Sequence, residues 1–489
     1  MAGRTARFAG PTQDFLTTLP HELLGNIIGL LCPYEISLAT SPSARQYLLH
    51  TPYRRALADF AKVCLVSRQL RRVAQPLLFR AISYSRNVPD YDEETNPFTP
   101  NLVLRSLTER PDLGRHVRYL EFTEHRRLAA IVDDTTDDDA PLAEQPQEAA
   151  TQQAQTQTEE GEDATHLAIS ILEHCKLIQT LVLCVPDLAL IDPRDTGLKL
   201  NNLRTMILGQ AAGIDYFRDD KVFEMAPSLR ELFCLHERRR RMAPSAVEMA
   251  LDHFQTLRRL SIEGISFPQM RLIMTECTSI EDVEYYKTIG QGTTNVTSLV
   301  NVFLPAKDRL KRLMIAHIPY YLPRRVVDGQ HIPGNAVGYD PVPRVADWRR
   351  QRIINKSELA RLKEFRNLRA LGIDWLTHKG GYDSRFEVAD PLSDMMPQNL
   401  ETLRIFDGMY SMKTEFDQLA KEIPDRFKQL KKIFLGSMLR SEKDPREDHN
   451  PDFPIGLWDG IESLKELVEV EYIRDTNPLR LMPRQDLLY

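Results

Sequence analysis

A short apolar pattern recurs along most of the chain and limits its possible folds more than any other sequence feature. Apolar residues stand at the first, fourth and sixth positions of this pattern, and the prediction rests on eleven occurrences of it. Successive occurrences start 61, 25, 26, 28, 23, 30, 58, 32, 30 and 37 residues apart, mostly near the roughly 20–29 residues of a short stacked repeat. Such a unit cannot bury an apolar face alone, so the pattern predicts a stacked array with one strand per unit. The occurrences start at Val117, Ile178, Leu203, Leu229, Leu257, Ile280, Leu310, Leu368, Leu400, Leu430 and Leu467.

Apolar residues at helical spacing precede four of these predicted strands. They lie within residues 168–175, 247–254, 270–277 and 416–423. A helix followed by a strand at a nearly constant period predicts parallel strands that are joined by helical crossovers. A doubly wound α/β domain is the alternative, and we disfavour it because the repeat runs too long and too evenly.

The spacing of 61 residues contains an acidic segment, residues 131–164. It holds eleven Asp and Glu residues, and no Lys or Arg occurs between Leu128 and Cys175. Such a composition cannot bury enough apolar surface to offset the entropy of ordering, so we expect a disordered insertion. The formal net charge of the whole chain is -6, and without these eleven acids it would be +5.

The spacing of 58 residues contains a second insertion, residues 316–357, which is rich in Pro, aromatic residues and Arg. Aromatic residues and Arg are enriched at the energetic centres of protein interfaces. The insertion follows a predicted strand directly, so we expect it to fold over the inner face of the array and to help bind a protein target. A loop that merely packs on the array is the alternative. The candidate target-binding residues are Tyr320, Tyr321, Arg324, Arg325 and Trp348.

The N-terminal region has the pattern of a small helical module. An apolar stripe between Leu19 and Leu31 predicts one helix, with Pro20 in its first turn. A second stripe runs from Val63 to Leu77 and predicts another helix, which we expect to end at Pro76.

Residues 15–82 resemble the F-box family. The resemblance is carried by Leu19-Pro20 with Glu22-Leu23-Leu24 and Ile27-Ile28, and by the run from Val63 to Arg80, which is similar to fungal members. An ordinary helical bundle is the alternative. The family binds a Skp-family adaptor, which implies adaptor-binding roles for Leu19, Pro20, Leu23, Leu24, Ile27, Ile28, Val63 and Cys64.

Residues 100–489 resemble a divergent leucine-rich-repeat array, most closely at Leu257-x-x-Leu260-x-Ile262. The asparagine that usually follows the strand in that family is absent. The expected fold class is therefore α/β, with a small all-helical F-box followed by an irregular leucine-rich-repeat-like solenoid of parallel strands and helices.

The sequence carries no recognisable catalytic motif. There is no phosphate-binding glycine loop and no G-x-S-x-G nucleophile motif, and His21-Glu22-Leu23-Leu24-Gly25 lacks the second histidine of a zinc-binding helix. We therefore expect no catalytic residue, no metal and no cofactor. An enzyme whose site is assembled from scattered residues stays as a minor alternative.

Composition also bears on location and partners. The six Cys residues form no C-x-x-C pair, the N-terminal residues lack the apolar core of a signal peptide, and no apolar run is long enough to span a membrane. We expect a cytoplasmic or nuclear protein with no membrane partner. The pI of about 6.1 argues against nucleic-acid binding. The basic run His236–Arg241 lacks interleaved aromatic residues, which leaves a solvated turn or a site for an acidic partner.

The F-box resemblance implies a substrate-recognition subunit of a Skp–cullin–F-box ubiquitin ligase. In that class the helical module binds the adaptor, and through it a cullin, while the repeat array holds the protein target. Ubiquitin transfer belongs to other subunits, so this chain is expected not to be an enzyme. A protein-binding scaffold that uses the adaptor without a cullin is the alternative.

Overall fold

The computed structural model describes most of the predicted array and part of the N-terminal region. The described residues are 19–30, 51–86, 99–124, 166–184, 197–208, 221–234, 251–263, 265–288, 299–318, 325–327, 330–332, 360–374, 391–406, 413–436 and 461–473.

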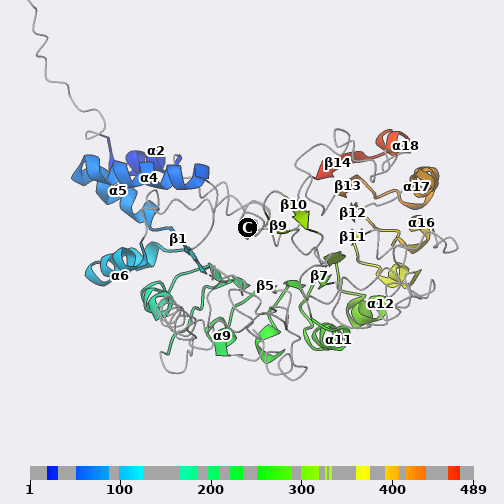
Figure 1. Cartoon of the computed structure of the whole chain (residues 1–489), viewed down its shortest axis with the longest axis horizontal. Helices are drawn as coiled ribbons and strands as arrows, with labels where there is room; N and C mark the ends of the chain where they lie inside the picture. Colours follow the sequence, from blue (N-terminus) through cyan, green and yellow to red (C-terminus); the bar gives the residue numbers. More distant parts are fainter. Residues whose placement is uncertain are drawn as a thin grey trace, which may run out of the picture.

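Within these residues, one twelve-stranded sheet forms the body of the molecule. All its strands pair in parallel and follow chain order. Figure 1 shows the sheet lining the inner side of an arc, with the helices on the outer side. The fold is an α/β solenoid. Its strands are β1 (Ala81–Arg86), β2 (Tyr119–Glu124), β3 (Thr180–Cys184), β4 (Thr205–Leu208), β5 (Glu231–Cys234), β6 (Arg259–Glu263), β7 (Asp282–Thr288), β8 (Arg312–Ile318), β11 (Ala370–Asp374), β12 (Thr402–Phe406), β13 (Lys432–Gly436) and β14 (Glu469–Ile473).

The eleven strands predicted from the repeat are confirmed, and their phase is also correct. Leu260 and Ile262 are fully buried on β6, as are Leu403 and Ile405 on β12. They point to the core between sheet and helices, because alternate residues of a strand face opposite sides. The start of the last repeat is an exception: Leu467 is exposed and its neighbour Val468 is buried instead. No further repeat follows β14 among the described residues.

A twelfth strand, β1, precedes the predicted array. Ala81–Arg86 pairs in register with Tyr119–Glu124 of β2. Phe79, Ile82 and Tyr84 match all three apolar positions of the repeat pattern, so this strand could have been identified from sequence. The sheet therefore begins at Ala81, so the last two residues that were predicted to belong to the helical module are already part of a strand.

The connections on the outer side are partly helical. Residues 166–174, α11 (Phe267–Glu276) and α17 (Lys413–Arg426) confirm three of the four predicted helices. The fourth is described only as a short 3-10 turn, η5 (Leu251–Phe254). The other described connections contain α6 (Pro100–Glu109), η3 (Leu113–His116), α9 (Lys221–Glu224), α12 (Leu299–Phe303), η7 (Leu304–Ala306), η9 (Ala360–Glu364), α16 (Leu392–Met395) and α18 (Ile461–Lys465).

The N-terminal module contains α2 (His21–Leu30), α4 (Thr51–Val66) and α5 (Arg68–Leu78). The first helix is confirmed, but the single helix predicted over Val63–Leu77 is wrong. Ser67 divides it, because the Ser67 hydroxyl accepts a hydrogen bond from the Leu70 N–H and so begins a new helix. The predicted end at Pro76 is also wrong, since α5 continues to Leu78.

The two predicted insertions lie mostly outside the described residues. Nothing of the acidic segment, 131–164, is described. Within 316–357 the structure describes the end of β8 and a two-stranded antiparallel hairpin, β9 (Arg325–Val327) and β10 (Gln330–Ile332). In the view of Figure 1 this hairpin lies on the inner side of the arc.

Candidate functional site

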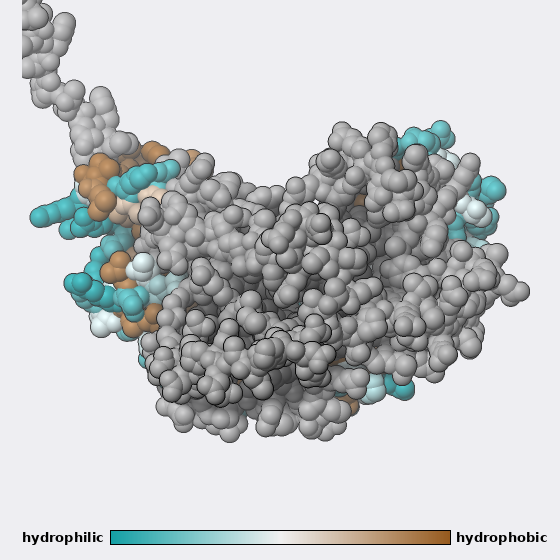
Figure 2. Space-filling model, viewed as in Figure 1, coloured by the Kyte–Doolittle hydropathy of each residue, from teal (hydrophilic) through white to brown (hydrophobic). Residues whose placement is uncertain are grey.

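Exposed apolar side chains gather on two helices of the N-terminal module. Leu23, Ile27 and Leu30 on α2, with Leu65 and Val66 at the end of α4, are between 44% and 86% exposed. They are five of the eight strongly exposed large apolar residues among the described part of the chain. Figure 2 shows hydrophobic residues at this end of the arc. We call these five residues the apolar N-terminal surface.

The spacing of the apolar residues along α2 explains this exposure. Leu24 and Ile28 lie on one side of the helix and are buried in the core of the module, whereas Leu23 and Ile27 lie on the other side. The apolar N-terminal surface therefore consists of side chains that remain exposed although the module has a buried core of its own. Exposed apolar groups of this kind mark interaction sites more often when they gather than when they are scattered.

The structure divides the eight predicted adaptor-binding residues. Pro20, Leu23 and Ile27 are exposed, and Leu19 and Val63 are half-buried. Leu24, Ile28 and Cys64 are buried, so their side chains shape the module from inside.

The prediction omitted three members of the apolar N-terminal surface. Leu30 continues the Leu23–Ile27 stripe by one turn and could have been found from that spacing. Leu65 and Val66 depend on the break at Ser67, which a single continuous helix does not suggest.

The predicted target-binding residues cannot be placed. Tyr320, Tyr321, Arg324 and Trp348 lie outside the described residues, and of Arg325 only the backbone, in β9, is described. The basic run His236–Arg241 also lies outside them. None of the predicted site residues lies on a strand of the twelve-stranded sheet.

That inner face carries a cluster of charged residues in the middle of the array. Two arginines, Arg259 on β6 and Arg312 on β8, flank Glu284 on β7. A guanidinium nitrogen of Arg259 lies 2.9 Å from Oε1 of Glu284, and Arg312 pairs with the same oxygen. Asp282 lies 3.4 Å from Arg259 and 3.5 Å from Arg312.

Burial controls the electrostatics of this cluster. The Glu284 side chain is 1% exposed. Burial raises the pKa of Asp282, although Arg312 and Arg259 oppose the shift. Burial, and then the charge of Glu284, also raise the pKa of Tyr286 well above its ordinary value, so Tyr286 remains a neutral phenol. Charges this deep are stable only when they are paired.

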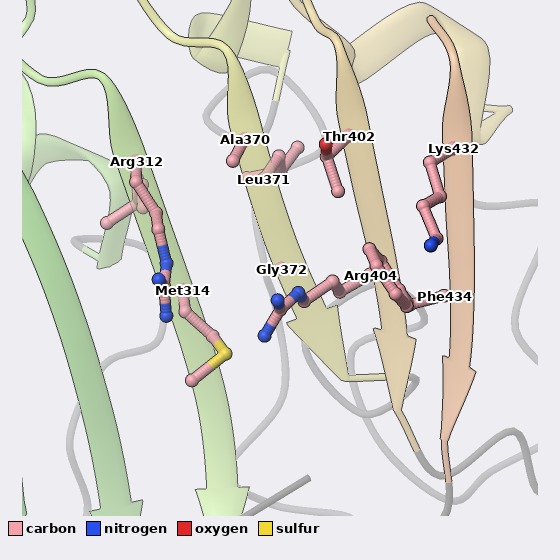
Figure 3. Close-up of a pocket in the computed structure, with 10 residues that line it drawn as sticks. Arg312, Met314, Ala370, Leu371, Gly372, Thr402, Arg404, Lys432 and Phe434 are labelled. Carbon is pink, nitrogen blue, oxygen red and sulfur yellow. The ribbon is translucent and has the colours of Figure 1, made fainter. Parts of the chain in front are cut away.

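A cavity of about 300 Å³ lies beside the cluster, over β8, β11, β12 and β13. The cavity exists because β11 carries two small residues, Ala370 and Gly372, between the larger side chains of β8 and β12. Figure 3 shows Arg404 extending from β12 across β11 toward Met314. The cavity is lined by Arg312, Leu313, Met314, Ala370, Leu371, Gly372, Thr402, Arg404, Lys432 and Phe434.

Three cations line this cavity, and they differ in their partners. Arg312 pairs with Asp282 and Glu284, and Lys432 lies 3.0 Å from Glu469 and 2.5 Å from Glu471. Arg404 forms no ion pair with any described residue; its guanidinium carbon lies 4.8 Å from the centroid of the Phe434 ring. Burial, and then repulsion from Arg312, lower the pKa of Arg404.

Among the described residues, no group of three or more His, Cys, Asp or Glu side chains is placed to hold a metal ion. In the same part of the chain, no helix has the length and apolar character needed to cross a bilayer.

Comparison with known proteins does not add a family to these observations. No family model matches the sequence, and no curated protein matches it.

Proposed function

We propose that this protein is the substrate-recognition subunit of a Skp–cullin–F-box ubiquitin ligase. The N-terminal module would bind a Skp-family adaptor, and the inner side of the solenoid would hold the protein target. The proposal combines the family resemblance of residues 15–82 with the two surfaces described above.

The observation that carries the proposal is the apolar N-terminal surface. Leu23 and Ile27 occur in the segment that resembles the adaptor-binding part of an F-box, and their side chains are exposed. Burying one such side chain in an interface removes apolar area from water and is worth roughly 1.5–3 kcal/mol. A partner that covers this surface would therefore gain substantial binding free energy.

The link between the module and the solenoid supports a receptor role. Helix α5 leads within two residues into β1, and Arg110 donates a hydrogen bond of 2.9 Å to the Gln75 side chain across the junction. A target on the solenoid would then be held at a defined position relative to the adaptor. Such a receptor accelerates transfer by raising the effective concentration of target near the transferring enzyme.

A scaffold that binds the adaptor without a cullin is the second candidate, and it needs the same apolar N-terminal surface. Affinity purification of the full chain separates the two functions. Recovery of a Skp-family adaptor together with a cullin supports the ligase subunit, whereas recovery of the adaptor alone supports the scaffold. Absence of the adaptor, with the chain folded, would reject both.

A further inference from the structure

We propose that the cavity around Arg404 binds a carboxylate side chain, Asp or Glu, of a protein partner. The inference rests on the proposed function in one respect: if the chain is a substrate receptor, the partner that supplies the carboxylate is its target. The binding chemistry comes from the cavity alone.

The position of Arg404 in the sheet prepares it for such a ligand. Met314, Gly372, Arg404 and Phe434 occupy one row across four strands, each in register with the next. Because Gly372 has no side chain, Arg404 can lie across β11, and Phe434 supports its guanidinium group from the other side. A guanidinium fixed in this way presents paired donors that match a carboxylate with little loss of side-chain entropy.

The balance of charge favours a monoanion. Carboxylates of this chain already pair with Arg312 and Lys432, and Arg404 alone is left without an ion pair among the described lining residues. The four cations and the four carboxylates named around the cavity balance each other, so any bound anion adds net negative charge. A carboxylate adds one charge, whereas a phosphate monoester adds about 1.5 to 2 at neutral pH, so the carboxylate is the better match.

The surroundings disfavour an extended polyanion. Asp282 and Glu284 of β7 lie on one side of the cavity, and Glu469 and Glu471 of β14 lie on the other. A nucleic-acid backbone crossing the strands would place phosphates against these carboxylates. The volume of about 300 Å³ is at the lower limit for small-molecule sites and suits one side chain and its bound water. Thr402, in the adjoining row, adds a hydroxyl that can donate to a bound carboxylate.

The test uses the full chain and three pools of fluorescent undecapeptides. Each pool has a fixed central residue, namely Glu, Gln or phosphoserine, flanked by random uncharged residues. A fluorescent single-stranded oligonucleotide serves as a fourth probe. Binding is measured by anisotropy for the wild type, Arg404→Met and Arg404→Lys. The matched control is Arg369→Met, which removes an exposed cation one residue before β11 and outside the cavity lining.

We expect the wild type to bind the Glu pool at least about tenfold more tightly than the Gln pool, the effect of one charge-assisted hydrogen bond. Arg404→Met should abolish this preference, Arg404→Lys should reduce it, and Arg369→Met should preserve it. Equal binding of the Glu and Gln pools, or a preference that survives Arg404→Met, would overturn the inference. Tighter binding of phosphoserine or the oligonucleotide, lost in Arg404→Met, would also overturn it in favour of a phosphate site.

Failure of the proposed function would look different. Changing Leu23 and Ile27 to Asp should leave the Glu preference intact, because α2 is far from β12 along the arc (Figure 1). A chain that binds no adaptor but keeps the preference would reject the ligase proposal and retain the carboxylate site.

Discussion

Arg404 and Phe434 are register partners on β12 and β13, and the guanidinium carbon lies 4.8 Å from the ring centroid. This aromatic contact stabilises the cation by roughly 0.5–2 kcal/mol. It replaces the carboxylate that the other arginines of the inner face possess: Arg259, for example, pairs with Glu284. The contact holds Arg404 in place, and no carboxylate of the described residues pairs with its guanidinium group.

Removing Arg404 should therefore not destabilise the fold. Burial and the neighbouring Arg312 both disfavour its charge, and an apolar replacement relieves this penalty. We expect the melting temperature of Arg404→Met to be equal to or higher than that of the wild type. A loss of many degrees would mean that Arg404 serves the structure, and that its effect on binding is indirect.

Removing Glu284 should have the opposite effect. Glu284→Gln keeps the shape but leaves the guanidinium groups of Arg259 and Arg312 without their shared carboxylate. Breaking a buried ion pair in this way costs about 3–5 kcal/mol, which urea denaturation can measure. Glu471→Gln, which removes an exposed partner of Lys432, is the control and should cost far less. Similar losses in both variants would contradict the burial of the cluster.

The raised pKa of Asp282 gives a pH dependence with a definite sign. A carboxyl group whose pKa is higher in the folded chain binds protons more tightly when folded. Its contribution to stability is greatest below the unfolded pKa and is lost as the pH rises through the folded value. The stability of the wild type minus that of Asp282→Asn should therefore fall as the pH rises above the ordinary carboxyl pKa of about 3.9. A difference that rises with pH would show that the ion pairs outweigh burial.

The solenoid core gives a prediction about strand phase. Leu260 is fully buried on β6, so Leu260→Ala should open a cavity and cost about 2–5 kcal/mol. Arg258 lies just before the same strand and is exposed, so Arg258→Ala should cost much less. Chemical denaturation of the two variants checks this difference. Equal costs would contradict the assigned phase.

The array could be predicted from sequence because each strand repeats one simple signal. Pairs such as Leu260 and Ile262 identify the buried side of a strand without reference to any other part of the chain. β1 carries the same signal in Phe79, Ile82 and Tyr84, and it was missed because residues up to 82 were assigned to the helical module. The division between α4 and α5 was missed because it depends on a hydroxyl cap at Ser67, a local effect that apolar periodicity does not report.

The cavity could not be predicted in the same way. It requires Gly372, Arg404 and Phe434 to lie side by side, although 32 and 30 residues separate them along the chain. Their common fifth position in successive repeats is a signal that an alignment of the repeats could have revealed. The exposed side of α2 could be predicted only in part. The apolar periodicity identifies the apolar residues of the helix, but it does not tell which of them face the core of the module.

Direct binding of a purified Skp-family adaptor tests the central claim most directly. The affinity of the full chain for the adaptor is measured by calorimetry for the wild type, for Leu23→Asp with Ile27→Asp, and for Leu102→Asp. Leu102 is an exposed leucine on α6, so its replacement is the matched control. We predict that the wild type and Leu102→Asp bind alike and that the double variant binds at least about tenfold more weakly, as for the loss of interface hot spots. No adaptor binding by the folded wild type, or equal affinity in the double variant, would contradict the account.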